Sequence, residues 1–482
     1  MRIPVKRLNV KVMPDAHRVI ARFFYNGEER AKEILKHIYS LSDQDVYFLI
    51  TPILQEFSKR HRNITRLLNK HAQKLHELID IKLDEHSPFR RLLIGAYFTH
   101  EYSIESAAFF NPSIVDDLDQ SDLEEGERRI IISFRAVGEG HISSIVFRKA
   151  LITKENNIEV MPSGKYVDEA EIIKNNTYIK QLFFEKVQDV QIPNEIVKLI
   201  DPILEERFDY RTLKQKVDDL KVQHPDNTDI DKILWLADSY HEILFSLDTD
   251  LSDRIIYPIS EFEKNGIEDA RFVKFVYDDG TVKYYATYTA YDGHVIMPKL
   301  LETSDFCEFR VRPIYGGGAK NKNLALFPRK INGKFVMISR IDGWNNYIMF
   351  SDKLHIWNDP KLLQSPKFIW EFVQIGNCGS PIETSDGWLM ITHGVGAMRK
   401  YCLGALLLDL EDPSKIIGRL REPILMANKD EREGYVPNVV YSCGSIINND
   451  ELIIPYGLSD YSSSFVKVNL TQLLIKLKEE II

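Results

Sequence analysis

The sequence predicts a mainly β protein with a helical extension at its N-terminus and a helical insertion within the β region. From about residue 107 onward, short runs of Val, Ile, Phe, Tyr and Leu alternate with Asp, Asn and Gly turns. Before residue 85, and again between residues 193 and 246, apolar residues recur at helical spacing instead. Many short strands with frequent turns are typical of a sandwich, a barrel or a propeller, and no clear internal repeat chooses among the three.

The N-terminal extension, residues 1–100, is expected to be mainly helical over residues 14–85. Asp15 is placed to cap a first helix, and Ser42 with Asp45 forms a capping pattern just before an apolar run. Residues 1–74 hold 15 Lys/Arg against 7 Asp/Glu, a net charge of +8. Since the whole chain has a net charge of −9, the remaining residues carry −17. A basic arm can bind nucleic acid. Here the charges alternate with apolar residues at helical spacing, so amphipathic helices packed on an acidic body are the favoured interpretation.

The β region, residues 101–475, is interrupted by the insertion at 193–246. Helices are predicted there at 194–204, 210–220 and 229–247, each with a charged outer face. Such a hairpin forms a lid or an oligomer contact, or it is a surface insertion without a role, and the sequence favours neither. The predicted strands are 129–135, 272–277, 283–291, 334–341, 387–393, 403–410, 439–447, 452–456 and 464–468.

Composition narrows the class of protein. A chain of 482 residues with 44% hydrophobic and 28% charged residues is typical of a globular protein of two or three structural units. No apolar run reaches the ~18–20 residues of a membrane span, and the first residues lack a secretory signal. The four cysteines have no metal-ligand spacing, so we expect a reduced, cytoplasmic protein without a metal. Gly316–Gly318 leads into a strand rather than a helix, which argues against a P-loop, and no organic cofactor is expected.

Short polar segments occur in a fixed order along the β region, most of them at the end of a predicted strand. A β-scaffold presents side chains to a shared pocket at such positions. From spacing alone, Asp269 and Arg271 share one face of a strand and can point into one pocket, although an Asp beside an Arg is usually a structural ion pair. The segments are Phe110-Asn111-Pro112-Ser113, Phe134-Arg135-Ala136, Gly266-Ile267-Glu268-Asp269-Ala270-Arg271, Leu326-Phe327-Pro328-Arg329-Lys330-Ile331, Ser339-Arg340, Thr392-His393-Gly394 and Val436-Pro437-Asn438-Val439.

Taken together, these segments resemble glycoside hydrolase family 130, the β-mannoside phosphorylases and their hydrolytic relatives. The resemblance spans residues 105–470 and implies a five-bladed β-propeller with its site in the central funnel. It also implies that Asp269 is the catalytic acid, in a motif where this chain has Ala270 in place of the usual proline. Residues 1–100 and the insertion lie outside the family's minimal domain and resemble its extended members, among which oligomannan phosphorylases occur.

The family's phosphate-contacting positions fall on six residues of this chain. Gln374 replaces a lysine, which removes one charge, and Arg399 lies near a position that is often tyrosine and can restore it. An inverting glycosidase needs a second carboxyl group as base, whereas a phosphorylase must hold a phosphate dianion with cations and N–H donors. None of the six is acidic, so phosphorolysis is favoured over hydrolysis. The six are Lys322, Asn323, Arg340, Gln374, His393 and Arg399.

The expected sugar-contacting residues complete the site. Most follow from the resemblance; Tyr288 is added because its ring can face a sugar, although a strand tyrosine is more often core. They are Asn111, Arg135, Arg271, Tyr288, Asp342, Tyr401, Asn438 and Asp460.

The resemblance therefore implies an inverting β-mannoside phosphorylase that uses inorganic phosphate as co-substrate and releases α-mannose 1-phosphate. β-1,2-linked manno-oligosaccharides are the expected substrates, and the acid is expected to relay its proton through the mannose 3-hydroxyl. A homo-oligomer is expected, with no nucleic-acid or membrane partner. An inverting β-mannosidase and a non-catalytic sugar-binding propeller are the alternatives. Linkage, acceptor sugar and chain length stay open.

Overall fold

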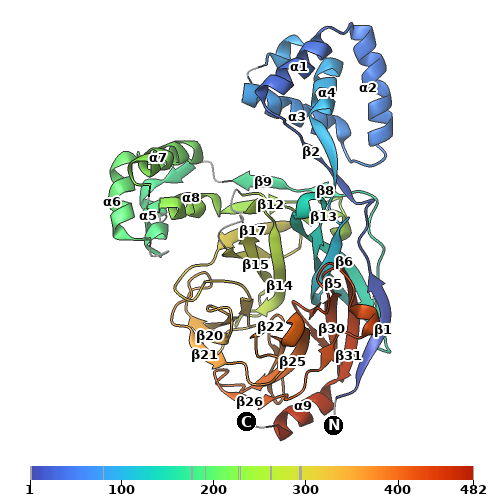
Figure 1. Ribbon diagram of the computed structural model, residues 1–482, viewed down its shortest axis with the longest axis vertical. Coiled ribbons are helices and arrows are strands. Elements are labelled where there is room, and N and C mark those ends of the chain that lie inside the picture. The colour runs from blue at the N-terminus through green and yellow to red at the C-terminus, as the bar shows by residue number, and fades with distance from the viewer. Residues whose placement is uncertain are drawn as a thin grey trace.

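A computed structural model of the chain describes residues 3–79, 81–174, 177–189, 192–225, 227, 230–260, 263–291 and 296–480. It is mainly β with helices, as predicted. A β body occupies most of the chain, and two helical parts extend from it (Figure 1). Within the described residues, no helix is both long and apolar enough to cross a bilayer.

Five sheets make up the β body in the described residues. Their strands pair antiparallel, apart from one short parallel pair between residues 168–169 and 254–255. The first contains β4 (Ala108–Asp116), β5 (Arg128–Val137), β6 (Ser143–Ile152), β7 (Ile158–Val160), β8 (Asp168–Glu169) and β13 (Arg254–Ile256). The second contains β14 (Ile267–Val276), β15 (Val282–Tyr291), β16 (Ile296–Thr303), β17 (Glu308–Pro313), β12 (His241–Leu244) and β9 (Glu171–Lys174). The third contains β18 (Ala325–Leu326), β19 (Phe335–Ser339), β20 (Asn346–Ser351) and β21 (Lys361–Gln364).

The last two sheets come from the C-terminal part of the chain. The fourth contains β22 (Gln374–Asn377), β23 (Ile382–Thr384), β24 (Gly387–Val395), β25 (Tyr401–Leu408), β26 (Ile416–Arg419) and β27 (Leu425–Met426). The fifth contains β28 (Val440–Tyr441), β29 (Ile446–Asn448), β30 (Glu451–Leu458), β31 (Ser462–Asn469) and β1 (Val5–Val12), and α9 (Leu470–Glu479) follows it. Buried aliphatic and aromatic side chains fill the spaces between neighbouring sheets, which holds the sheets together.

Strand β1 lies within the N-terminal extension that was predicted as mainly helical, but it belongs to the β body. It pairs antiparallel with β31, from Val5 opposite Val468 to Val12 opposite Ser463. The first residues of the chain therefore form the edge of the last sheet. The basic side chains of β1 suit an edge strand because charge discourages pairing with a further chain.

The N-terminal helices form a unit of their own rather than packing on an acidic body. A two-stranded ribbon of β2 (Val19–Phe23) and β3 (Thr99–Ser103) leads out from the β body to this unit (Figure 1). Helices α1 (Glu28–Tyr39), α2 (Asp43–Phe57), α3 (Ile64–Ile79) and α4 (Pro88–Tyr97) pack around a separate apolar core. The capping box of Ser42 and Asp45 at the start of α2 is confirmed.

The helical insertion begins earlier than residue 193. It contains β10 (Thr177–Ile179), α5 (Lys180–Asp189), α6 (Asn194–Ile200), β11 (Arg207–Asp209), α7 (Tyr210–Gln223) and α8 (Asp231–Asp238). Residues 226, 228 and 229, near and within the third predicted helix, lie outside the described residues. The flanking strands β9 and β12 extend the sheet of β14–β17 at its β17 edge. The apolar core of the insertion is continuous with the core of that sheet, so the insertion is built into the β body.

Candidate active site

A cavity of about 430 Å³ is lined by residues from all five sheets and the loops that follow their strands. Several lining residues come from or next to the first strand of a sheet, as with Asn111 on β4, Asp269 on β14 and Gln374 on β22. Others follow a strand end, as Arg340 follows β19. Of the predicted site residues, the cavity brings together Asn111, Arg135, Asp269, Lys322, Asn323, Arg340, Gln374, His393, Arg399, Tyr401 and Asp460.

The backbone around this cavity is unusual. Asn111, Asp269, Asn323, Arg399 and Asp460 all have left-handed φ angles, between 50° and 68°. Register shifts interrupt β4 between Phe110 and Ser113 and β14 between Glu268 and Arg271, as β-bulges do. Each such conformation costs on the order of 1–3 kcal/mol, and such strain clusters at functional sites. The strain is what turns these polar side chains toward a shared space.

Asp269 is held by amide and guanidinium groups. Asn111 Nδ2 donates to its Oδ1 at 2.6 Å, and Arg135 Nη1 lies 3.7 Å from the same oxygen. Burial by itself would raise the pKa of the Asp269 carboxyl, but the positive charges of Arg135, Arg271 and Lys322 outweigh it, and the pKa is lowered. The carboxylate is therefore ionised at neutral pH in the absence of a ligand.

Glu268 also lines the cavity, and sequence reasoning assigned it no role. Arg135 Nη2 donates to its Oε1 at 2.9 Å, and Lys322 Nζ donates to its Oε2 at 2.5 Å. Strand alternation would place Glu268 and Asp269 on opposite faces. The bulge in β14 removes that alternation, so both carboxylates reach the cavity. The charge of Lys322 is consequently shared with Glu268.

Arg271 lies beneath the cavity rather than in its wall. Its side chain is buried, Nη1 donates to the Asp269 carbonyl at 2.9 Å, and Nη2 donates to the Tyr441 hydroxyl at 2.7 Å. Asn323 Nδ2 donates to the same hydroxyl at 2.9 Å. Both lone pairs of the Tyr441 oxygen are thus used, which leaves its O–H as a donor. Tyr441 lines the cavity and, like Asn321 and Glu268, was not predicted.

Arg340 differs from the other cations of the cavity. It is 9% exposed, and no ion pair joins it to a carboxylate of the described residues. Its Nη1 lies 3.3 Å from His393 Nε2, while His393 Nδ1 lies 3.2 Å from the Asn377 carbonyl. Since an arginine can only donate, Nε2 accepts and the His393 proton is on Nδ1. The buried guanidinium therefore meets neutral acceptors alone.

His393 is neutral rather than cationic. Burial lowers the pKa of its imidazole well below the usual value, and the charges of Arg340 and Arg271 lower it further. A Cβ at position 376 would lie 2.4 Å from His393 Cε1, which explains why Gly376 stands beside the ring. The imidazole orients Arg340 and adds no charge.

Asp460 lines the same cavity, but its pKa is shifted in the opposite direction to that of Asp269. Burial raises the pKa of its carboxyl to about 6; Arg135 opposes this and the negative charge of Asp269 adds to it. Two carboxyl groups of one cavity thus have pKa values that are pushed apart, a pattern typical of acid–base sites.

Besides Arg271, three more predicted sugar contacts do not line the cavity. Tyr288 is 3% exposed in the core, where its hydroxyl donates to Glu263 Oε1 at 2.9 Å beside Lys299. The Asp342 carboxylate accepts from the backbone N–H groups of Trp344 and Asn345 at 2.8 and 2.9 Å, so it caps its own turn. Asn438 accepts from the backbone N–H of Tyr401 through its carbonyl, and its neighbours Val436 and Val439 line the cavity instead.

Several buried polar atoms around the cavity have no hydrogen-bond partner in the described residues. Buried polar groups are normally satisfied, and exceptions concentrated in one place are typical of a ligand site. The unpartnered atoms belong to donors as well as acceptors, so a ligand with both hydroxyl groups and anionic oxygens suits them. They are Asn111 Oδ1, Arg135 Nε, Arg271 Nε, Asn323 Oδ1 and Arg340 Nε.

Comparison with known proteins gives the chain a family context. The glycoside hydrolase 130 family model, described as beta-1,4-mannooligosaccharide phosphorylase, matches residues 225–479, more than half of the chain. A 1,2-beta-oligomannan phosphorylase of Thermoanaerobacter sp. is 41% identical over 210 residues, which cover 42% of this chain and 67% of that protein. A beta-1,2-mannobiose phosphorylase of the same organism is 41% identical over 40% of this chain, and the match spans 64% of that protein, less than two thirds.

A third relative is a beta-1,2-mannobiose phosphorylase of Listeria innocua, 31% identical over 52% of this chain and 69% of that protein. The solved structure of the beta-1,2-mannobiose phosphorylase from Listeria innocua, in complex with beta-1,2-mannobiose, aligns with a TM-score of 0.47 and 23% identity. That alignment covers 79% of this chain and 94% of that one.

Proposed function

The chain belongs to glycoside hydrolase family 130, the family of β-mannoside phosphorylases, and we propose that it cleaves β-1,2-linked manno-oligosaccharides with inorganic phosphate. The observation that carries the proposal is Arg340, a buried cation without a carboxylate partner in the described residues, in the same cavity as Asp269. A buried charge is costly unless it is paired. A phosphate dianion would supply the missing charge, and a water molecule would not.

We infer that the five sheets are the blades of a five-bladed β-propeller. Each sheet contains antiparallel strands that are neighbours in the chain, as from β14 to β17 and from β18 to β21, and residues from all five sheets and their loops line one cavity. The pairing of β1 with β31 supports this architecture, because it joins the first residues of the chain to the last sheet and so closes a ring. We therefore propose the predicted division into an N-terminal extension, residues 1–100, and a propeller, residues 101–475. The one change is that β1 belongs to the propeller.

The proposed chemistry is a single displacement with inversion. A phosphate oxygen held by Arg340 attacks the anomeric carbon, the bond from that carbon to the glycosidic oxygen breaks, and the leaving oxygen takes up a proton. Asp269 supplies this proton, directly or through the mannose 3-hydroxyl. The Asp269 pKa is lowered in the absence of ligand. The negative charge of bound phosphate offsets the cations that lower it, so substrate and phosphate together favour the protonated acid.

Glu268, Asp460, Asn111 and Arg135 supply donors and acceptors suited to sugar hydroxyl groups. We propose β-1,2 over β-1,4 linkage because two relatives named for β-1,2-linked mannosides are 41% identical over 42% and 40% of this chain. A beta-1,4-mannooligosaccharide phosphorylase of Ruminococcus albus is 36% identical over 29% of it. A cytoplasmic location is part of the proposal and rests on the four buried free cysteines.

The test is incubation with β-1,2-mannobiose and β-1,4-mannobiose, each with and without inorganic phosphate. We expect mannose 1-phosphate from the β-1,2 isomer only when phosphate is present. Release of free mannose at the same rate without phosphate would instead identify a β-mannosidase, for which Asp460 is a second carboxyl group in the cavity.

A further inference from the structure

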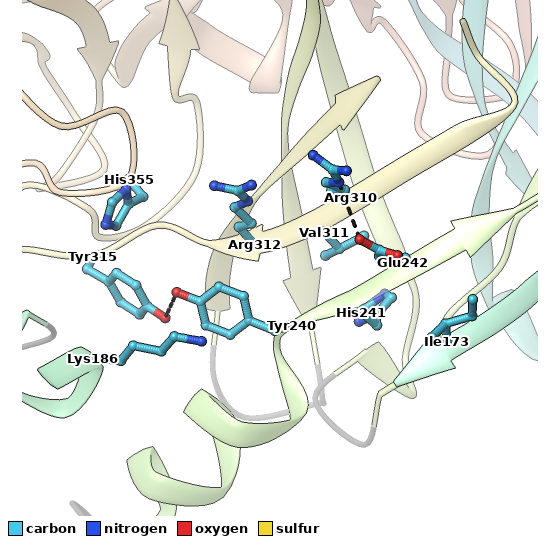
Figure 2. A pocket seen from close by; sticks show the side chains of 10 residues that line it. All are labelled: Ile173, Lys186, Tyr240, His241, Glu242, Arg310, Val311, Arg312, Tyr315 and His355. Carbon is cyan, nitrogen blue, oxygen red and sulfur yellow. Dashed lines mark hydrogen bonds and ion pairs between the residues drawn. The ribbon is translucent and has the colours of Figure 1, made fainter. Parts of the chain in front are cut away.

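A second cavity, of about 570 Å³, lies where the helical insertion meets the β17 edge of the β14–β17 sheet (Figure 2). β17 contributes Arg310 and Arg312, and the insertion contributes Lys186 from α5 and Tyr240 from the residues before β12. Strands β15 and β16 separate β17 from the β14 strand that carries Asp269. Three strand spacings put roughly 14 Å between the two strands, so this cavity is distinct from the active-site cavity.

Positive charge dominates the lining of the second cavity. It contains three basic side chains and one carboxylate, Glu242, which is 3.3 Å from Arg310 Nε. Arg312 Nη2 is 3.7 Å from Glu302, a carboxylate that Lys283 already binds at 2.6 Å. No ion pair joins Lys186 to a carboxylate in the part of the chain that the structure describes. Two positive charges are therefore left in excess.

Lys186 and Arg312 repel each other across this space. Burial lowers the pKa of the Lys186 ammonium group, and the charge of Arg312 lowers it further. Both groups are held by the fold, Lys186 with its Nζ 4.1 Å from the centre of the Tyr240 ring and Arg312 on β17 (Figure 2). An anion bound in the cavity would offset both positive charges.

Aromatic side chains supply an apolar wall beside the cations. The hydroxyl groups of Tyr240 and Tyr315 are 3.3 Å apart, and the His355 ring meets Tyr315 edge to face at 6.4 Å (Figure 2). Tyr315 is 3% exposed and packs in the core, so the half-buried Tyr240 is the ring that can meet the C–H surface of a sugar. The cavity volume falls in the range of small-molecule sites, roughly 300–1,000 Å³.

We propose that this cavity is a second anion-binding site for a small organic phosphate of the sugar phosphate class, with Lys186 and Arg312 holding the phosphate and Tyr240 beside the sugar ring. Because the insertion and the sheet each contribute one cation, the bound phosphate ties the insertion to the β body. The site does not depend on the reaction proposed for the first cavity.

The test separates the two cavities by mutation. In an Arg340→Gln background, which removes the free cation of the first cavity, glucose 6-phosphate is titrated by calorimetry. We expect one binding event, weakened roughly tenfold or more by Lys186→Met or Arg312→Gln, because each change removes a charge-assisted hydrogen bond. Lys186→Arg should keep most of the affinity. Lys216→Met, on the exposed surface of α7 in the same insertion, is the matched control and should leave the affinity unchanged.

Glucose and inorganic phosphate are the remaining arms of the titration. Glucose should not bind, and inorganic phosphate should bind more weakly than glucose 6-phosphate because it lacks the ring. Circular dichroism should show the Lys186→Met variant as stable as its parent, since the change removes a repulsion. Absence of glucose 6-phosphate binding in the Arg340→Gln background, or binding that Lys186→Met and Arg312→Gln leave unchanged, would overturn the proposal.

Discussion

Two groups of residues in the active-site cavity differ in whether their charges are paired within the protein. Glu268 and Asp269 are matched by Arg135 and Lys322 at 2.5 to 3.7 Å, so their charges are neutralised within the protein. Arg340 and its neighbour His393 have no such match among the described residues. The first group resembles a site for neutral hydroxyl groups, and the second a site for an anion. This difference, rather than the total charge of the cavity, supports phosphorolysis over hydrolysis.

The largest effect is expected at Asp269. Asp269→Asn keeps the size of the side chain but removes the acid, and loss of general acid catalysis costs roughly 10²–10⁴-fold in kcat. Phosphorolysis of β-1,2-mannobiose, followed as mannose 1-phosphate release, checks this. Asp342→Asn is the matched control, because that carboxylate caps a turn outside the cavity, and it should stay within a few-fold of wild type. Equal losses in both variants would remove the special status of Asp269.

A smaller effect, confined to phosphate, is expected at Arg340. Arg340→Gln removes the free cation, so KM for phosphate should rise roughly 10–100-fold, with a smaller change in KM for the mannoside. Arg329→Gln is the control, since that arginine is paired with Glu383 at the surface. If the KM values for phosphate and mannoside rise equally, the contrast between the two groups fails.

The order of the motifs allowed much of this site to be predicted. Asp269, Arg340 and His393 meet in one cavity although their segments are far apart in the sequence, because each lies at a strand end in a different sheet. Charge states could not be predicted in the same way. His393 was predicted at a phosphate-contacting position, but spacing could not show that burial and Arg340 keep it neutral. Protonation depends on neighbours in space, which spacing along the chain does not give.

Backbone irregularities account for most of the remaining differences. Glu268 was missed because a regular strand would turn it away from Asp269, and only the bulge brings both into the cavity. Tyr288 keeps the regular alternation and lies in the core. The pairing of β1 with β31 joins residues more than 450 positions apart. No local pattern in the first twelve residues indicates that partner.

Asp460 offers a pH-dependent comparison with Asp269. A carboxyl whose pKa is raised to about 6 in the folded protein destabilises the fold as it ionises, so the cost grows from about pH 4 to pH 6 and is complete above. Asp460→Asn removes this cost. The free energy of unfolding of the variant should therefore exceed that of wild type at both pH values. The excess should be larger at pH 8 than at pH 5, by on the order of 1 kcal/mol. Thermal unfolding at both pH values measures it, and a gain that is larger at pH 5 would contradict the assignment.

The smallest effect on the chemistry is expected from removing the N-terminal helical unit. Phe23 and Thr99 are paired neighbours at the end of the β2–β3 ribbon, so residues 24–98 can be replaced by a short turn without disturbing β1. The unit has its own apolar core, and the β body should therefore stay folded. Turnover of β-1,2-mannobiose should remain within a few-fold of wild type, because none of the unit's described residues lines the active-site cavity.

The same excision tests whether the unit holds copies of the chain together. Tyr47, Phe48 and Phe89 are 49%, 63% and 45% exposed on this unit, and exposed aromatic clusters usually mark contact surfaces. If they form an oligomer interface, light scattering should show a particle smaller by at least one whole chain, not merely by the excised residues. Preference for longer mannosides should change only if that interface also narrows access to the cavity. An excised protein with the same number of chains per particle would show that the unit has no part in assembly, and the aromatic cluster would then need a different partner.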